Sequence, residues 1–187
     1  VSTDWLADHL DDPSVVIVDG SWHLPGTNRD GRKEYDESHI PGAVFFDIDA
    51  FSDKTNPLPH MLPTPGAFAE AVGALGIDET QKIVVYDGLG LFSAPRVWWT
   101  FRIMGARDVV ILAGGLPKWK AEGRPLTDAQ PGRAPRIFRA SPVAGQVHDL
   151  DSVRANIDSA AFQLVDARPG ARFLGDAPEP RPGVRSG

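Results

Sequence analysis

The first candidate reactive site in this sequence is a loop between an apolar run and a helix-like segment. Residues 83–86 read Ile-Val-Val-Tyr, typical of a strand, and the loop at 87–93 that follows contains two glycines. Such a loop directs backbone N–H groups at one point, where they bind an anion or lower the pKa of a thiol. Its first residue is Asp87, whose carboxylate would repel an anion and cannot carry a persulfide. The alternative is an ordinary turn in which Ser93 caps the next helix.

Composition limits the chemistry further. The 187 residues contain no cysteine, which excludes disulfides, thiolate metal ligands and a thiol nucleophile within them. Acidic residues outnumber basic ones by 25 to 19, for a net charge of −6, so we expect no nucleic-acid partner. The apolar runs fall far short of the roughly 20 residues that span a bilayer, and Val1 begins no signal-peptide pattern. The sequence predicts a soluble, cytoplasmic protein without a membrane partner.

Apolar runs alternate with helix-like segments on both sides of this loop. The runs, at residues 15–18, 43–46, 83–86 and 109–112, are typical of buried parallel strands. One helix should begin at Thr64-Pro65 and end before Gly76; others should follow Ser93 and cover 117–122. This alternation predicts an α/β fold with a mainly parallel sheet flanked by helices. Its core is expected to contain Val16, Val18, Phe45, Val84, Val85, Val110 and Leu112.

An internal repeat indicates how the chain is divided. Residues 4–19 align with residues 151–166 at a constant offset of 147, and each stretch ends in an apolar run followed by Asp. Two unrelated helix–strand units can also share a pattern this short. The segment between is rich in Pro, Gly and Arg and lacks periodicity. We therefore expect a first domain at 1–125, a linker at 126–147, and the start of a second copy at 148–187.

Three segments of the chain resemble the signature segments of rhodanese domains. They are Glu-Ser-His-Ile-Pro-Gly-Ala at 37–43, the loop from Asp87 with its Ala-Pro-Arg-Val-Trp-Trp end at 94–99, and Leu-Ala-Gly-Gly-Leu at 112–116. The chain is similar to the tandem rhodanese-domain sulfurtransferases that act on thiosulfate or 3-mercaptopyruvate, and most similar to the mercaptopyruvate branch. In that family the first copy is inert and the second carries the catalytic cysteine at the start of its loop. The resemblance implies that 1–125 is the inert copy and 148–187 a truncated start of the catalytic one.

The resemblance also implies a catalytic pair in the first copy. Asp49 and His60 match an Asp and a His that mercaptopyruvate sulfurtransferases contribute to a charge relay with a serine of the catalytic loop. A carboxylate can orient an imidazole, which can then accept a proton from a hydroxyl. Taken alone, the residue types also suit a turn-forming Asp and a solvated loop His.

Two arginines of the second copy match substrate-binding positions of the family. Arg172 resembles an arginine that faces the active loop in both branches, and Arg181 resembles one typical of the mercaptopyruvate branch. A guanidinium binds a carboxylate through two hydrogen bonds, so a pair suits an α-keto acid. Arginines in a proline-rich loop are otherwise solvated, and we expect Arg168 to have a structural role.

Together these features predict part of a 3-mercaptopyruvate sulfurtransferase that needs no metal or organic cofactor. Sulfur would pass through a cysteine persulfide, absent from this chain, to a thiol, thioredoxin or cyanide, with release of pyruvate. The expected partners are the missing C-terminal fragment, a small sulfur donor and a thiol acceptor such as thioredoxin. The chain alone should be inactive. The alternatives are a thiosulfate:cyanide sulfurtransferase and a non-catalytic rhodanese-like interaction module.

Overall fold

The computed structural model describes residues 1–179, which form two compact units. The first covers Val1–Gln146 and the second begins at Val147. Within residues 1–179, no helix has both the length and the apolar character needed to cross a membrane. Each unit is described separately below.

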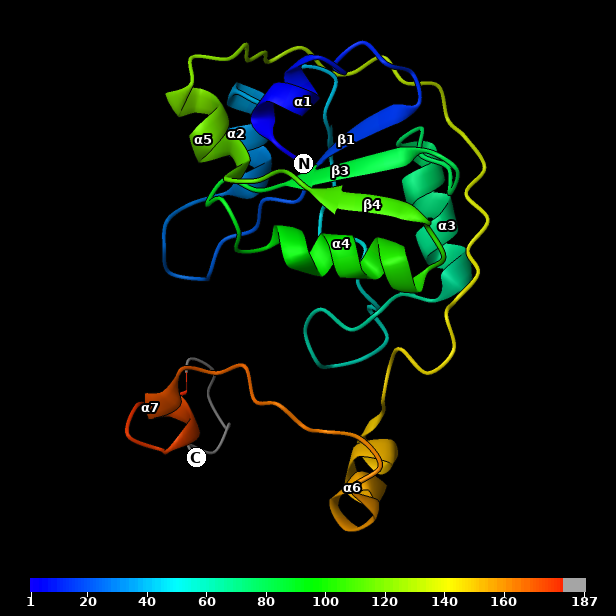
Figure 1. The fold of residues 1–187 in the computed structure, drawn as a ribbon, viewed down its shortest axis with the longest axis vertical. Coiled ribbons are helices and arrows are strands. Elements are labelled where there is room, and N and C mark those ends of the chain that lie inside the picture. Colours follow the sequence, from blue (N-terminus) through cyan, green and yellow to red (C-terminus); the bar gives the residue numbers. More distant parts are fainter. Residues whose placement is uncertain (180–187) are drawn as a thin grey trace. The chain divides into compact units, whose positions relative to one another are not determined.

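A four-stranded parallel sheet forms the centre of the first unit (Figure 1). Its strands are β1 (Val15–Asp19), β2 (Val44–Phe45), β3 (Lys82–Tyr86) and β4 (Asp108–Ile111), in the order β2-β1-β3-β4. Strand β1 lies between β2 and β3 and is buried along its whole length, which explains its continuous apolar sequence. The predicted α/β fold with a parallel sheet and flanking helices is confirmed.

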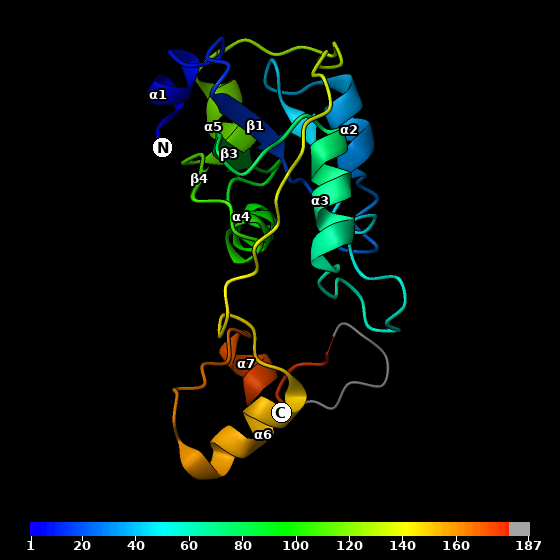
Figure 2. The same cartoon turned by 90° about the vertical axis from the view of Figure 1, so that its right-hand side faces the viewer.

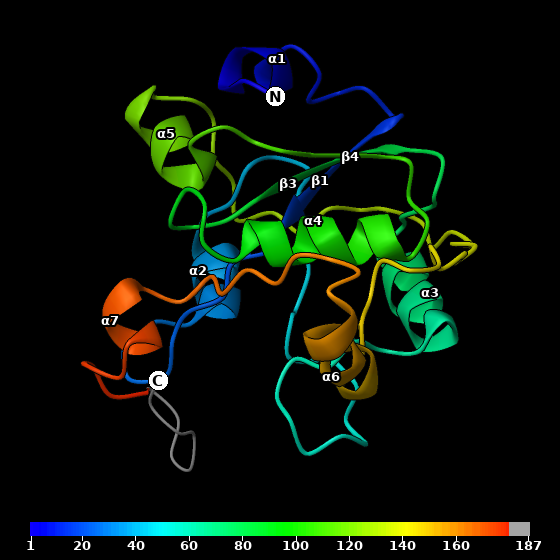
Figure 3. The same ribbon diagram turned by 60° about the horizontal axis from the view of Figure 1, so that its bottom comes forward.

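Alternate strand residues point to opposite faces of this sheet, and helices cover both faces (Figures 1 and 3). One face packs against α1 (Thr3–Ala7), α2 (Gly31–Glu37) and α5 (Gly115–Ala121). The other packs against α3 (Pro65–Ala74) and α4 (Ala94–Ile103). Of the expected core residues, Val110 is only partly buried; the others are buried, namely Val16, Val18, Phe45, Val84, Val85 and Leu112.

Helices α3 and α4 differ in how their first turns are capped. Helix α3 begins as expected, with the Thr64 hydroxyl accepting a hydrogen bond from the Ala67 N–H, and a left-handed Gly76 follows its end. Ser93 precedes α4, but its hydroxyl makes no capping bond, so the expected cap is wrong. The hydroxyl instead donates to the carbonyl of Gly20 and accepts from the N–H of Trp22. A long-range contact to the loop after β1 replaces the local cap.

The segment expected as a linker is extended but belongs to the first unit up to Gln146. In Figure 2 it runs alongside α3. The N–H of Arg136 donates to the carbonyl of Gly73, where a Cβ would come within 2.5 Å of the Arg136 carbonyl oxygen. Phe138 contacts Phe68 and Phe101 in the core. Because its apolar side chain completes the core beside α3 and α4, this segment is not a free tether.

The second unit contains α6 (Leu150–Ser159) and α7 (Gly170–Phe173) in its described part. Helix α6 matches the helix expected from the repeat, whereas residues 164–166, expected as a strand, form none. Leu164 and Val165 are 53% and 81% exposed. A strand requires a neighbour for its backbone hydrogen bonds, and residues 147–179 contain no other strand to supply one.

Replacing Phe138 tests whether the extended segment contributes to the core. Phe138 is 4% exposed and its neighbour Ile137 is 73% exposed, so the two provide a matched comparison. We expect Phe138→Ala to lower the free energy of unfolding by about 3 kcal/mol through cavity formation, and Ile137→Ala to change it by less than about 0.5 kcal/mol. Urea unfolding followed by circular dichroism measures both. Equally small losses would contradict a structural role for the segment.

Candidate functional site

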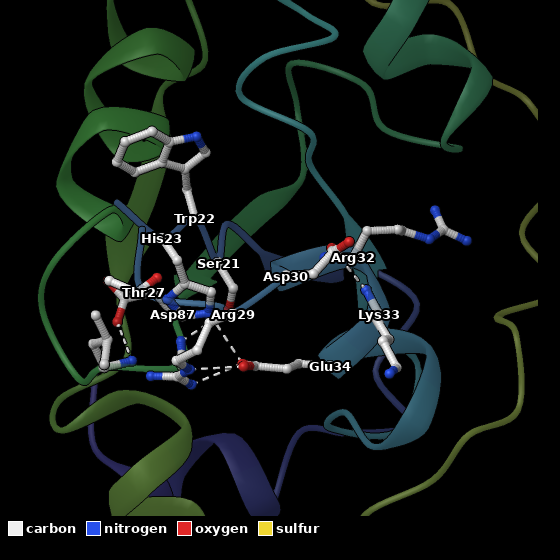
Figure 4. A network of polar contacts seen from close by, with 12 residues as sticks. Ser21, Trp22, His23, Thr27, Arg29, Asp30, Arg32, Lys33, Glu34 and Asp87 are labelled. Carbon is white, nitrogen blue, oxygen red and sulfur yellow. Dashed lines mark hydrogen bonds and ion pairs between the residues drawn. The ribbon is translucent and has the colours of Figure 1, made fainter. Parts of the chain in front are cut away.

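The candidate site is formed by the loops at the carboxyl edge of the sheet. Trp22 lies after β1, Asp49 after β2 and Asp87 directly after β3. Because parallel strands all end at the same edge, these loops meet although they are far apart in the sequence. Figure 4 shows two of these residues, Trp22 and Asp87, with the polar side chains near them.

The loop at 87–93 forms the predicted N–H cradle, and the side chain of Asp87 fills it. Its carboxylate is buried and accepts four backbone hydrogen bonds of 2.6–2.9 Å, from the N–H groups of Leu89, Phe92, Ser93 and Ala94. We expected this carboxylate to repel an anion; it is itself the anion that the loop binds. The backbone N–H groups that could hold a substrate anion or a sulfur atom are therefore already used.

Asp49 and His60, predicted as a pair from the resemblance, lie in contact. The Nε2 atom of His60 is 2.8 Å from Oδ1 of Asp49. The side chain of His60 is 23% exposed and that of Asp49 is 60% exposed, so solvent and small molecules can reach the pair. An imidazole oriented by a carboxylate can exchange a proton with a third group. The contact is present, and the catalytic role remains a prediction.

Two further residues hold this pair, and sequence reasoning missed both. The indole N–H of Trp22 donates to Oδ2 of Asp49 over 2.8 Å, and the guanidinium of Arg96, on α4, donates to the backbone carbonyl of His60. Burial lowers the pKa of Arg96. The signal for Trp22 was its position just after a central strand, where side chains of parallel sheets meet. Nothing in the sequence connects Arg96 with His60.

Beside the pair is an open cavity of about 290 Å³ whose lining includes Trp22, Arg29, Arg32 and Asp49. The Arg29 guanidinium makes a two-fold ion pair with Glu34, with distances of 2.7 and 2.8 Å, as Figure 4 shows. Those hydrogen bonds hold the pKa of Glu34 below its ordinary value. Since each cation at this site already has a carboxylate partner, Asp36 in the case of Arg32, the cavity offers no ready-made site for a substrate anion.

The predicted substrate-binding arginines belong to the second unit. Arg172 lies in α7, where its guanidinium is bonded to Glu179, with its Nε 3.1 Å from Oε2. Arg168 binds both Asp166 and Glu179 at 2.7–2.8 Å, consistent with its expected structural role. Hydrogen bonds from Arg172 and Arg168 keep the pKa of Glu179 low. Arg181 lies outside the described residues.

Comparison with known proteins identifies the family to which the chain is similar. The rhodanese-like domain family matches residues 2–122. The chain is 45% identical to "Thiosulfate/3-mercaptopyruvate sulfurtransferase 1, mitochondrial" of Arabidopsis thaliana, a match over all of this chain and 55% of that protein. It is 46% identical to the thiosulfate sulfurtransferase of Bos taurus over 96% of this chain and 62% of that protein. The crystal structure of SseA, a 3-mercaptopyruvate sulfurtransferase of Escherichia coli, superposes with a TM-score of 0.85 and 42% identity, covering 97% of this chain and 70% of SseA. The chain thus spans a little more than half the length of these two curated relatives.

The buried carboxylate of Asp87 gives a prediction about stability. Asp87→Ala removes the acceptor of the buried N–H groups of Ser93 and Ala94 and of the partly buried N–H groups of Leu89 and Phe92, and should lower the free energy of unfolding by about 2–4 kcal/mol. Asp87→Asn should cost less, because the amide oxygen can take the place of Oδ2 and keep the three bonds made there, while the NH₂ group faces only the N–H of Leu89. Urea unfolding measures both variants.

Asp53 supplies the control. It accepts hydrogen bonds from the backbone N–H and hydroxyl of Thr55 in a solvent-accessible turn, where water can replace it, so Asp53→Ala should cost less than about 1 kcal/mol. An Asp87→Ala loss no larger than this control would show that the carboxylate does not organise the loop.

Proposed function

The chain belongs to the rhodanese-like domain family, and we propose that it is part of a sulfurtransferase that takes sulfur from 3-mercaptopyruvate. The sulfur would be carried on a cysteine outside these 187 residues and passed to a thiol, to thioredoxin or to cyanide. One observation carries this proposal: the chain is 45% identical, over its entire length, to a relative named for thiosulfate and 3-mercaptopyruvate sulfur transfer.

The proposed reaction has two steps. A cysteine thiolate attacks the sulfur of 3-mercaptopyruvate, the carbon–sulfur bond breaks, and the electron pair leaves on carbon as the enolate of pyruvate, which then takes up a proton. The transferred sulfur remains on the cysteine as a persulfide. An acceptor thiolate or cyanide then attacks this outer sulfur and releases the cysteine thiolate. In each step, one bond to the transferred sulfur atom breaks as another forms.

In this proposal the pair Asp49 and His60 moves a proton. Their 2.8 Å contact orients the imidazole, which would accept a proton from a serine hydroxyl belonging to the catalytic loop. An imidazole suits this task because its pKa lies near neutrality in the absence of perturbation. The exposed position of the pair supports the proposal, since the reacting group must reach it.

Arg172 and Arg181 would bind the carboxylate and the carbonyl of the keto acid. Two guanidinium groups match the charge and planar geometry of that substrate. The guanidinium of Arg172 is bonded to the carboxylate of Glu179. A bound keto acid would therefore compete with, or share, this carboxylate partner.

The proposed catalytic partner is a further polypeptide segment that completes the second unit and supplies the thiol. The greater length of the relatives and the exposed apolar residues at 164–165 support it. The proposed compartment is the cytoplasm; the name of the Arabidopsis relative instead includes "mitochondrial", so cell fractionation decides this point.

Two alternatives are favoured by particular observations. The bovine relative is named a thiosulfate sulfurtransferase, which favours thiosulfate as the donor. The carboxylate of Asp87 in the loop cradle and the absence of cysteine favour a non-catalytic interaction module. The two experiments that follow separate these alternatives from the mercaptopyruvate transferase.

We expect the isolated chain to release no pyruvate from 3-mercaptopyruvate and no sulfite from thiosulfate, because it has no thiol to carry sulfur. Addition of a segment that completes the second unit and contains one cysteine should restore turnover. The measurement is pyruvate and sulfite release by chain verified by intact mass. Turnover by the pure chain would exclude the cysteine mechanism, whereas inactivity of the completed protein with both donors would favour the interaction module.

Substrate choice in the completed protein tests the arginines. Arg181→Ala should raise KM for 3-mercaptopyruvate by about one to two orders of magnitude, or roughly 1.4–2.8 kcal/mol, and affect thiosulfate less. Arg172→Ala should impair both donors, because an arginine facing the loop interacts with any anionic donor. Arg181→Lys should recover only part of the loss. Equal losses on both donors for Arg181→Ala would remove the support for 3-mercaptopyruvate.

A further inference from the structure

We propose that Trp22 is a positioning residue that fixes the proton of His60 on Nε2 and thereby makes Nδ1 the atom that accepts a proton. The chemical consequence rests on the proposed function, but the positioning itself concerns only residues of the first unit. Trp22 lies in the loop after β1, whereas Asp49 and His60 lie at two positions of the segment between β2 and α3.

The two oxygens of the Asp49 carboxylate have different partners. Oδ2 accepts from the indole N–H of Trp22 and Oδ1 contacts Nε2 of His60, each over 2.8 Å. An ionised carboxylate can only accept hydrogen bonds, so the Nε2 atom must carry the proton in this contact. In the neutral ring Nδ1 is then unprotonated. Within residues 1–179, no group makes a hydrogen bond to this Nδ1 atom.

Trp22 is itself held in place from the loop at 87–93. Its backbone N–H donates to the hydroxyl of Ser93 over 3.1 Å, and its ring lies parallel to that of Phe92, with centroids 6.5 Å apart and an angle of 13°. The edge-to-face contact with His60 has a centroid distance of 4.9 Å. The Trp22 indole thus links the carboxylate, the imidazole and the loop after β3.

The backbone of His60 is held independently. Its φ angle of 58° lies in the left-handed region, which is unfavourable for a residue with a side chain. The Arg96 guanidinium binds the His60 carbonyl and lies over the Trp99 ring at 4.8 Å. Fixing the backbone through Arg96 and the carboxylate through Trp22 leaves the imidazole one orientation, with Nε2 toward Asp49.

Asp49→Asn provides a sharp test, because an amide has one acceptor and one donor end. If the Trp22 N–H holds position 49, it must bind the amide oxygen, and the NH₂ group then faces Nε2 of His60. Nε2 must now accept, so the proton moves to Nδ1. We expect the ratio of the two ring tautomers to change by about fivefold or more toward the Nδ1–H form.

The double variant Trp22→Phe with Asp49→Asn removes the constraint on the amide. The amide can then turn its oxygen toward His60, and the Nε2–H form should recover. Phenylalanine retains an aromatic ring against Phe92 while removing the N–H group. Trp98→Phe is the matched control, since it deletes an indole N–H that donates to the carbonyl of Val109, away from the pair.

The measurement is ¹⁵N NMR of the imidazole nitrogens of the 187-residue chain at about pH 8.5, where an ordinary imidazole is neutral; His60→Gln assigns the signals. Reversal of the tautomer in Asp49→Asn, but not in Asp49→Asn combined with Trp22→Phe, supports the proposal. An unchanged Nε2–H form in Asp49→Asn overturns it, as does the same reversal in the double variant. Asp49 is largely exposed, so the single variant should fold.

Activity of the completed protein separates the positioning from the proposed function. If His60 is the base, Trp22→Phe should lower kcat for 3-mercaptopyruvate about tenfold and change KM little, while Trp98→Phe changes neither. A tautomer that responds as proposed together with an unchanged kcat would retain the positioning role and reject the proton relay. Loss of the tautomer response rejects the positioning role whatever the activity.

Discussion

Four parallel strands that end at one edge of a sheet impose the arrangement on which the rest of the first unit depends. Backbone hydrogen bonding aligns β2, β1, β3 and β4, so the loops that follow them must meet. Trp22, Asp49 and Asp87 come together for this reason and not because they attract one another. The helices on both faces keep water from the strands, so all variable chemistry is confined to the loops.

The loop after β3 shows how one side chain determines what such a site can do. Its N–H groups converge in the way that suits an anion or a thiolate, but the carboxylate of Asp87 takes them. This local ion binding stabilises the loop and removes its capacity for a ligand. The solvent-accessible polar pair of the first unit, Asp49 and His60, lies beside the loop. Ser93 of the loop binds the backbone of Trp22, and the indole of Trp22 binds Asp49.

The two units show that a strand sequence needs a sheet. Residues 15–19 and 164–166 have similar apolar patterns. The first stretch is the buried β1, with partners on both sides, whereas the second has no strand partner within residues 147–179 and leaves Val165 exposed. A central strand is stabilised by hydrogen bonds and packing with its neighbouring strands, so the same pattern gives different structures in the two units.

Local patterns in the sequence determined the fold class, the strands of the first unit and the limits of α3, because apolar runs and the Thr64, Pro65 and Gly76 signals act over a few residues. The absence of cysteine determined that no thiol chemistry resides in these residues. The contact between Asp49 and His60 was predicted by resemblance, since neither residue type nor spacing required it. The three-dimensional contacts were needed to show that Ser93 binds the β1 loop instead of capping α4, that Phe138 belongs to the core, and that Trp22 and Arg96 hold the pair. Those contacts join residues separated by 27 to 73 positions. Local periodicity describes only residues close in the sequence, so it cannot predict which distant residues the sheet brings together.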